Sequence, residues 1–237
     1  MLTNLKRLYI KTRAFFSRCV RAVCWLPLRL RRLIQHIWHG ITVFFVKKQR
    51  RIPDWWQDFA FLMMDLVAVP ELFETIVDFG KWNTRPLTPL ERQLAASVFG
   101  SVLNLDAIRV DEKAWIGCQK HKILYVSYFI INAWGCIRPQ IFIHELVHVW
   151  QFQKQGGAYI PRALRAQKSK QGYNYGGIEA LRASKELGGR LVDFNLEQQA
   201  EIVGDYYAIR EGLKPAWGKG KTADLPIYDY FVAQVRE

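Results

Sequence analysis

The sequence of 237 residues predicts an α+β protein in which a basic helical arm precedes a globular body. Three observations support this. Basic residues concentrate in residues 1–52, a strand-like stretch lies near the middle of the chain, and a His-Glu-x-x-His motif within an apolar run follows it. Half of the residues are hydrophobic, which is enough for one sizeable core. We therefore expect an arm of residues 1–52 and a body of residues 53–237, with a short sheet and a helix that carries the motif.

The charge of the chain is unevenly distributed. Its formal net charge is +13, and residues 1–52 contain 13 of the 34 basic residues and none of the 21 acidic ones. Apolar residues and arginines interleave on both sides of Pro27, which predicts two amphipathic helices broken near that residue. The longest uncharged run, residues 33–46, is shorter than the about 20 residues that span a membrane. Arginines interrupt the earlier apolar run, which argues against a cleaved signal peptide.

A basic amphipathic arm that contains Trp and Phe is typical of segments that bind an anionic membrane surface or a groove on a partner protein. Binding through its charges would weaken as salt rises. Nucleic acid is the competing partner, because the same charges would contact phosphates. The apolar content of the arm favours a membrane or a protein.

The four cysteines form no Cys-x-x-Cys pair, which argues against a zinc site built from cysteines. Cys118 and Cys136 flank an extended segment, so a disulfide between them is one alternative. Free thiols in a reducing cytosol are the favoured one, because the sequence has no clear export signal.

The first part of the body alternates between helical and strand-like patterns. Residues 53–80 have apolar side chains at near-helical spacing. Thr88 and Glu91 form a capping-box pattern that predicts a helix to about Val98. Residues 107–134 read as strands, either as a plain core sheet or with an edge strand that holds an extended substrate by its backbone.

The His-Glu-x-x-His motif is His144-Glu145-Leu146-Val147-His148. Residues four apart lie on one face of a helix, so His144 and His148 can bind one Zn²⁺ ion together. Glu145 points to a different side, where its carboxylate can take a proton from a water on the ion. Pro139 suits the first turn of this helix and Gly156 its end.

The remainder of the chain predicts further helices and a loop. Residues 156–177 are polar and rich in turn formers, which indicates a loop over the cleft. A helix over residues 178–187 follows. Asn195 begins another, which ends at Gly212. Residues 225–235 predict one more short helix.

The third metal ligand has two arrangements, because Glu197, Glu201 and Asp205 lie on one helix face but cannot all reach one ion. In the favoured arrangement Glu197 binds the metal and Glu201 accepts a hydrogen bond from a ligand histidine. In the alternative, Glu201 is the third ligand and Asp205 is its supporting acid.

Five motifs carry a family resemblance. They are Leu87–Glu91, Val98–Gly100, Ile108–Val110, Phe142–Gln151 and Asn195–Val203. Together they resemble the bacterial zincin-like family of Vgr-related proteins, named after type VI secretion spike proteins, over residues 86–210. The resemblance does not cover the arm.

The resemblance implies a zinc metallopeptidase that hydrolyses peptide bonds with a metal-activated water and that is associated with type VI secretion or Rhs-type toxin systems. His144, His148 and Glu197 would bind Zn²⁺, and Glu145 would be the general base. Two rival functions are a non-catalytic, zinc-stabilised adaptor of a secretion system and a membrane-active effector. We expect a location in the bacterial cytoplasm, at the periphery of the inner membrane, or outside the cell after secretion.

Overall fold

The computed structural model describes residues 4–43, 52–81, 83–121 and 123–237, so the basic side chains predicted for the arm at positions 47, 48, 50 and 51 lie outside the described residues. Within these ranges the architecture is α+β and mostly helical, with a small sheet. The helices are α1 (Asn4–Cys24), α2 (Leu26–Thr42), α3 (Ile52–Leu66), α4 (Val69–Gly80), α5 (Pro89–Phe99), α6 (Pro139–Gln155), α7 (Tyr159–Gln167), α8 (Gly177–Glu186), α9 (Leu196–Arg210) and α10 (Leu225–Val232). The strands are β1 (Thr84–Pro86), β2 (Arg109–Asp111), β3 (Tyr125–Ser127) and β4 (Ile130–Asn132).

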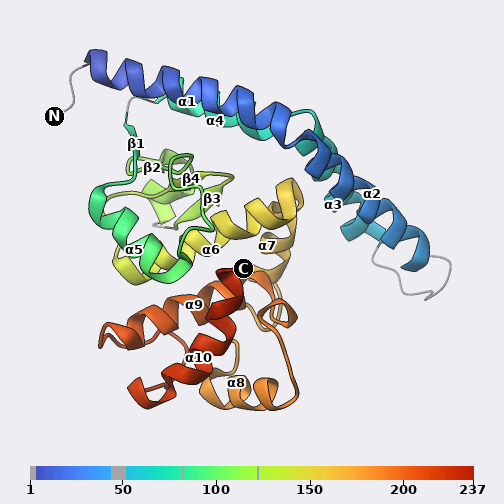
Figure 1. Ribbon diagram of the computed structural model, residues 1–237, viewed down its shortest axis with the longest axis vertical. Helices are drawn as coiled ribbons and strands as arrows, with labels where there is room; N and C mark the ends of the chain where they lie inside the picture. Colours follow the sequence, from blue (N-terminus) through green and yellow to red (C-terminus); the bar gives the residue numbers. More distant parts are fainter. Residues whose placement is uncertain (1–3, 44–51, 82, 122) are drawn as a thin grey trace.

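Three groups of elements follow one another through the molecule (Figure 1). Helices α1 and α2 run end to end along one edge, and α4 and α3 return beside them. The sheet, α5 and α6 occupy the middle, and α8, α9 and α10 form the opposite end. Helix α6 packs along α9, so it joins the central group to the end that contains α10.

The sheet has the strand order β1-β2-β4-β3, in which β2 and β4 are parallel and both outer pairs are antiparallel. Sequence patterns predict an extended run through residues 123–132, but the chain reverses there to form the β3–β4 hairpin. Tyr128 lies in the turn with φ of 62°, in the left-handed region. As a result, β3 becomes an edge strand of the sheet.

The buried core lies between the sheet, α5, α6 and α9. Phe99, Ile108, Phe142, Leu146 and Ile202 are each at most 2% exposed and belong to one contiguous apolar cluster. Burying a large apolar side chain contributes about 1.5–3 kcal/mol. The core therefore fixes α6 against its neighbours, and α6 carries the His-Glu-x-x-His motif.

Several predicted boundaries are confirmed. Glu91 N–H donates to Thr88 Oγ1 at 3.2 Å, and Thr88 N–H donates to Glu91 Oε2 at 2.7 Å, which is the predicted capping box. Helix α6 begins at Pro139 and ends before Gly156, whose φ of 68° suits glycine.

The predicted loop over residues 156–177 is wrong in its first half, because α7 spans Tyr159–Gln167. Pro161 indicates a loop when it is read from the sequence alone, but here it lies in the first turn of α7. The first amides of a helix have no intrahelical acceptor, so a proline without an N–H is tolerated there. Residues 168–176 remain turns and irregular chain.

The arm forms the two predicted helices, but its basic face is turned inward. Arg18, Arg21 and Arg29 are each at most 8% exposed and pair with acidic residues of α3 and α4. Arg18 Nη2 lies 2.9 Å from Asp78 Oδ2, and Arg21 Nε lies 2.8 Å from Glu71 Oε1. These ion pairs cross the predicted boundary at residue 52, so α1 and α2 pack as one layer with α3 and α4.

All four cysteines are free, and Cys118 is buried. Among the described residues, no helix combines the length and the apolar character that a membrane crossing requires.

The ion pairs of the layer predict a large effect for Glu74→Ala. Glu74 is 1% exposed, pairs with Arg21, lies 3.4 Å from Arg18 Nε, and accepts from the Phe129 N–H at 3.2 Å. Removing it leaves buried charges uncompensated, so urea denaturation should show a loss of about 3–5 kcal/mol in the free energy of unfolding. Arg92→Ala, which breaks an exposed pair with Asp106, is the matched control and should change it by less than about 1 kcal/mol. Equal effects of the two variants would contradict this account of the layer.

Candidate metal centre

Two helices supply the side chains of the site. His144 and His148 are one turn apart on α6, and Glu197 comes from the first turn of α9. Helix α9 begins in a capping box, where the Gln198 N–H donates to Asn195 Oδ1 at 2.9 Å and the Asn195 N–H donates to Gln198 Oε1 at 3.0 Å. This cap fixes where α9 begins and thereby the direction in which Glu197 points.

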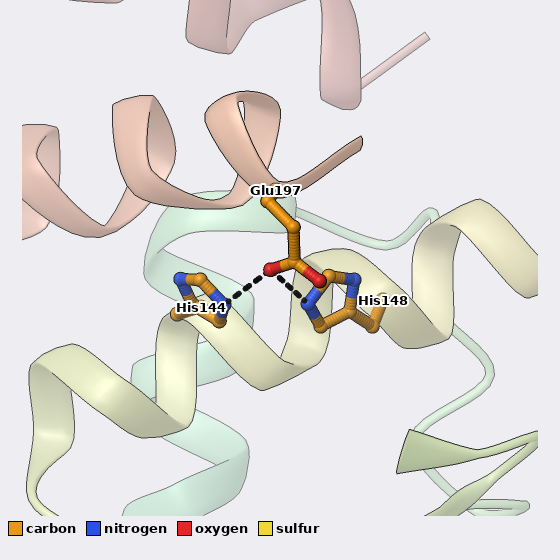
Figure 2. A group of neighbouring side chains, drawn as sticks. All are labelled: His144, His148 and Glu197. Atoms are coloured by element: carbon orange, nitrogen blue, oxygen red, sulfur yellow. Dashed lines mark ion pairs between the residues drawn. The ribbon is translucent and has the colours of Figure 1, made fainter. Parts of the chain in front are cut away.

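The three side chains converge. Figure 2 shows Glu197 reaching from α9 toward both histidines on α6. Its Oε2 atom lies 3.5 Å from His144 Nε2 and 3.3 Å from His148 Nε2. One ligand atom from each residue lies within 4.8 Å of the other two. Ligands of a tetrahedral zinc with bonds of about 2.0–2.1 Å lie about 3.3 Å apart, so the carboxylate–imidazole spacing suits such an ion.

A second observation supports the fit of a cation. Glu197 is 5% exposed, and apart from the two imidazole nitrogens that it faces, its Oε2 atom has no hydrogen-bond partner among the described residues. A buried carboxylate oxygen without a partner is costly, and a metal ion coordinated between the imidazoles would satisfy it. Two imidazoles and one carboxylate are a donor set that zinc hydrolases use.

The pKa shifts of the cluster also favour positive charge between the carboxylates. Burial disfavours protonated His144, but the carboxylates of Glu197 and Glu201 outweigh it and raise its pKa to about 10. Burial likewise disfavours ionised Glu197, but the two imidazoles lower its pKa to about 2. The pocket therefore stabilises positive charge at the histidines, where protons and a metal ion would compete.

Glu145 lies beside the cluster on α6. It is 5% exposed, and its Oε2 atom has no hydrogen-bond partner in the described part of the chain. Burial raises the pKa of its carboxyl group, and the neighbouring imidazoles only partly oppose this. A carboxylate with a raised pKa in a cleft is a suitable general base.

Gln151 holds His148 in place, a role that sequence reasoning did not assign. Its Nε2 donates to the Leu196 carbonyl at 2.9 Å and to Gln199 Oε1 at 3.1 Å. Its Oε1 therefore faces His148 Nδ1, at 2.8 Å, and accepts the proton of that nitrogen. This hydrogen bond leaves Nε2 of His148 as the nitrogen that faces Glu197. The sequence signal is a glutamine three residues after the second histidine, one turn along α6.

Glu201 lies one turn beyond Glu197 on α9 and contacts the other histidine. Its Oε1 atom is 3.3 Å from His144 Nδ1. This position matches the favoured of the two predicted arrangements, in which Glu201 supports a histidine through the ring nitrogen that does not face Glu197.

Asp205 has a different environment from that expected in the alternative arrangement. It is fully buried and accepts hydrogen bonds from Tyr175 Oη at 2.6 Å and from the Gly218 N–H at 2.8 Å, beside further backbone donors of residues 216 and 217. Gln140 Nε2 also donates to it at 3.3 Å. Asp205 thus anchors the chain that follows α9, and none of these hydrogen-bond partners is a histidine.

The cluster opens into a cleft of about 420 Å³ that contains Glu145, both histidines and Glu197. Residues of β3 and α7 form its walls, and Tyr173 lines it from the segment after α7. The ring centroid of Tyr173 lies 6.1 Å from that of His144. A larger cavity of about 970 Å³ is lined by residues of α6 and α7, by the start of α9 and by the segment before it, but none of the four site residues lines it. The smaller cleft is therefore the candidate site.

No protein-family model and no solved structure matches the chain. The chain is similar to the type VI secretion system spike protein VgrG2b of Pseudomonas aeruginosa, with 30% identity over 135 residues. This alignment covers 52% of the chain and 13% of the relative. The zincin-like fold expected from the sequence stays a prediction.

Three variants distinguish the acids of α9. Glu197→Ala should abolish zinc binding measured by calorimetry, whereas Glu201→Ala should weaken it by about 10–100-fold because only a supporting contact is lost. Asp205→Ala should keep zinc binding but lose at least about 3 kcal/mol of unfolding free energy, since several buried donors lose their acceptor. Zinc binding by Glu197→Ala at the affinity of the parent protein would contradict the favoured arrangement.

Gln151→Ala tests the support of His148. Loss of the Nδ1 hydrogen bond should lower zinc affinity by about 10–100-fold. Gln153→Ala is a matched control, because Gln153 lies on the same helix and joins it to residues 102 and 104 away from the histidines. The control should affect thermal stability alone, and equal zinc affinity of the two variants would exclude a positioning role for Gln151.

Proposed function

We propose that this chain is a zinc-dependent peptidase with its active site at the cluster of His144, His148 and Glu197. The observation that carries the proposal is the convergence of these three side chains in one cleft with Glu145, whose buried Oε2 atom has no hydrogen-bond partner among the residues that the structure describes. A purely structural metal site has no need of a buried base beside it, so the presence of Glu145 favours hydrolysis over a zinc-stabilised adaptor.

The residues have distinct roles in this proposal. His144, His148 and Glu197 would hold Zn²⁺, and the ion would supply a bound water of lowered pKa and polarise the substrate carbonyl. Glu145 accepts the proton of the attacking water and returns it to the leaving amine. Gln151 orients His148, and Glu201 orients His144, each through the Nδ1 atom of the histidine. Tyr173 lines the cleft, where its hydroxyl is a candidate donor to the carbonyl oxygen.

The cleft favours an extended peptide as substrate. Tyr125, Val126 and Ser127 of β3 line it, and β3 lies at the edge of the sheet. An extended peptide can add to such an edge through backbone hydrogen bonds, which do not depend on its sequence. At Val126 it would have to share or displace the hydrogen bond that Tyr159 Oη donates to the carbonyl at 2.6 Å. The sheet edge thus supports a peptide substrate more directly than a small molecule.

The similarity to VgrG2b supports an association with type VI secretion. The relative is named as a spike protein, and this chain corresponds to a small part of its length. We infer that the chain performs its hydrolysis in the context of such a system.

Glu145→Gln tests the chemistry. Glutamine has a similar volume but accepts no proton, so zinc content measured by elemental analysis should be unchanged. Cleavage of a fluorescently labelled casein and of a peptide library should fall by at least about a hundredfold. Glu179→Gln, at an exposed position on α8, is the matched control and should retain full activity.

The two measurements separate the proposal from its rival. Zinc binding without cleavage by the parent protein would indicate the adaptor. Full activity of Glu145→Gln would show that another group accepts the proton.

A further inference from the structure

Helices α1 and α2 bury arginines and expose apolar side chains, which is the reverse of a typical surface helix. Such helices bury their apolar stripe and expose their charges. Here Arg18 and Arg29 are buried, while Phe16 and Val20 are more than 60% exposed. At 100° per residue, Phe16 and Val20 lie about 160° around the helix from Arg18, on the side away from the protein.

The apolar stripe continues along both helices. Its exposed side chains include Leu5, Phe16, Val23, Leu30, Ile34 and Trp38. Helices α1 and α2 contain 21 and 17 residues, so the stripe follows rods of about 30 Å and about 25 Å (Figure 1). A continuous apolar surface of this length marks an interaction site.

Helix α4 extends this surface. Leu72, Ile76 and Phe79 are exposed on α4, while Glu71 and Asp78 of the same helix are buried in ion pairs. The ring centroids of Phe79 and Phe15 lie 6.5 Å apart in an edge-to-face contact, which joins the exposed apolar side of α4 to that of α1. We name the exposed apolar side chains of α1, α2 and α4 the apolar face.

The charges around the apolar face have one sign along α1 and α2. Residues 1–52 contain no acidic side chain. Arg13 and Arg31 are exposed, and each lies three residues, or about 60° around the helix, from a member of the apolar face, Phe16 and Ile34 respectively. A long apolar stripe bordered by cations and bearing Tyr9 and Trp38 matches the headgroup and acyl levels of an anionic bilayer.

We propose that the apolar face of α1, α2 and α4 docks the protein on an anionic lipid bilayer, with the helices lying in the plane of the membrane. The ion pairs between α1–α2 and α3–α4 satisfy the inner charges, so the layer exposes apolar side chains without leaving those charges facing lipid. Docking is therefore chiefly apolar, and only the bordering cations contact headgroups. This proposal is independent of the zinc chemistry, because none of its residues lines the candidate site.

The full chain should sediment with vesicles of mixed phosphatidylcholine and phosphatidylglycerol, and less with phosphatidylcholine alone. Ile34→Glu with Trp38→Glu should weaken binding by at least about a hundredfold, because two large apolar contacts are lost. Leu187→Glu with Leu213→Glu is the matched control, since both leucines are exposed apolar residues outside the apolar face, the first directly after α8 and the second shortly after α9. The control should bind as the parent protein does, and thermal melting followed by circular dichroism should show both variants folded.

Two further measurements, vesicle binding in high salt and the oligomeric state without lipid, test whether the apolar face binds a bilayer. Binding should persist in high salt, because the buried arginines do not contribute to it. Complete release of the parent protein by salt would overturn apolar docking, as would equal vesicle binding by the parent and Ile34→Glu/Trp38→Glu. A parent protein that forms oligomers without lipid, and that becomes monomeric with these two substitutions, would assign the face to a second copy of the chain.

A fluorophore on Cys19 provides a second measurement. Cys19 is exposed on α1, one residue before Val20 of the apolar face. In a variant that keeps this cysteine alone, a polarity-sensitive label should shift to shorter wavelength on mixed vesicles. In a second variant that keeps only the exposed Cys136, the emission of the same label should not shift. The absence of a shift at Cys19 would overturn the proposal.

Discussion

The packing of α6 along α9 is the constraint on which the candidate site depends. His148 and Glu197 are 49 residues apart in the chain, and they meet because the apolar sides of the two helices share one core. Gln151 links the same two helices by a polar route, since it contacts His148 on α6 and the Leu196 carbonyl at the start of α9. A buried amide with both ends paired allows little freedom in how the helices align, because each misplacement leaves a polar group without a partner. The spacing of the two nitrogens around Glu197 Oε2 follows from this alignment.

Sequence alone predicts the elements whose signals are local. The motif on α6, the capping box at Thr88 and the start of α9 at Asn195 each depend on residues within a few positions of one another, and all three agree with the structure. The spacing of Glu197, Glu201 and Asp205 left two arrangements open. To choose between the two arrangements, one must know the direction from which α9 approaches α6, and long-range packing sets that direction. Asp205 illustrates the difficulty, because its hydrogen-bond partners lie 11 to 13 residues later and 30 and 65 residues earlier in the chain.

The arm shows that an amphipathic pattern alone does not determine which face of a helix packs against the rest of the protein. The alternation of apolar and basic residues correctly predicts two amphipathic helices, and the usual rule then assigns the basic side to the surroundings. That rule assumes that no other segment neutralises the charges. Glu71, Glu74 and Asp78 of α4 do so here, and nothing in residues 1–52 indicates it. Moving such charges out of water costs several kcal/mol per ion unless each finds a partner, so the acids of α4 are the condition under which the apolar side can face outward.

Helix α7 connects this layer to the candidate cleft. On its outer side, Arg162 Nε donates to Asp58 Oδ2 of α3 at 2.7 Å, and Arg165 Nη2 donates to the other carboxylate oxygen at 2.5 Å. On its inner side, Ile160 and Ala163 line the cleft beside the histidines. The turn before α7 packs directly on α3. At Gly157 the two backbones are so close that an added Cβ atom would lie 2.6 Å from the Phe61 carbonyl oxygen. Only glycine permits two backbones to approach in this way. One wall of the cleft is therefore attached to the layer that carries the apolar face, and the orientation of that layer on any surface fixes the orientation of the cleft.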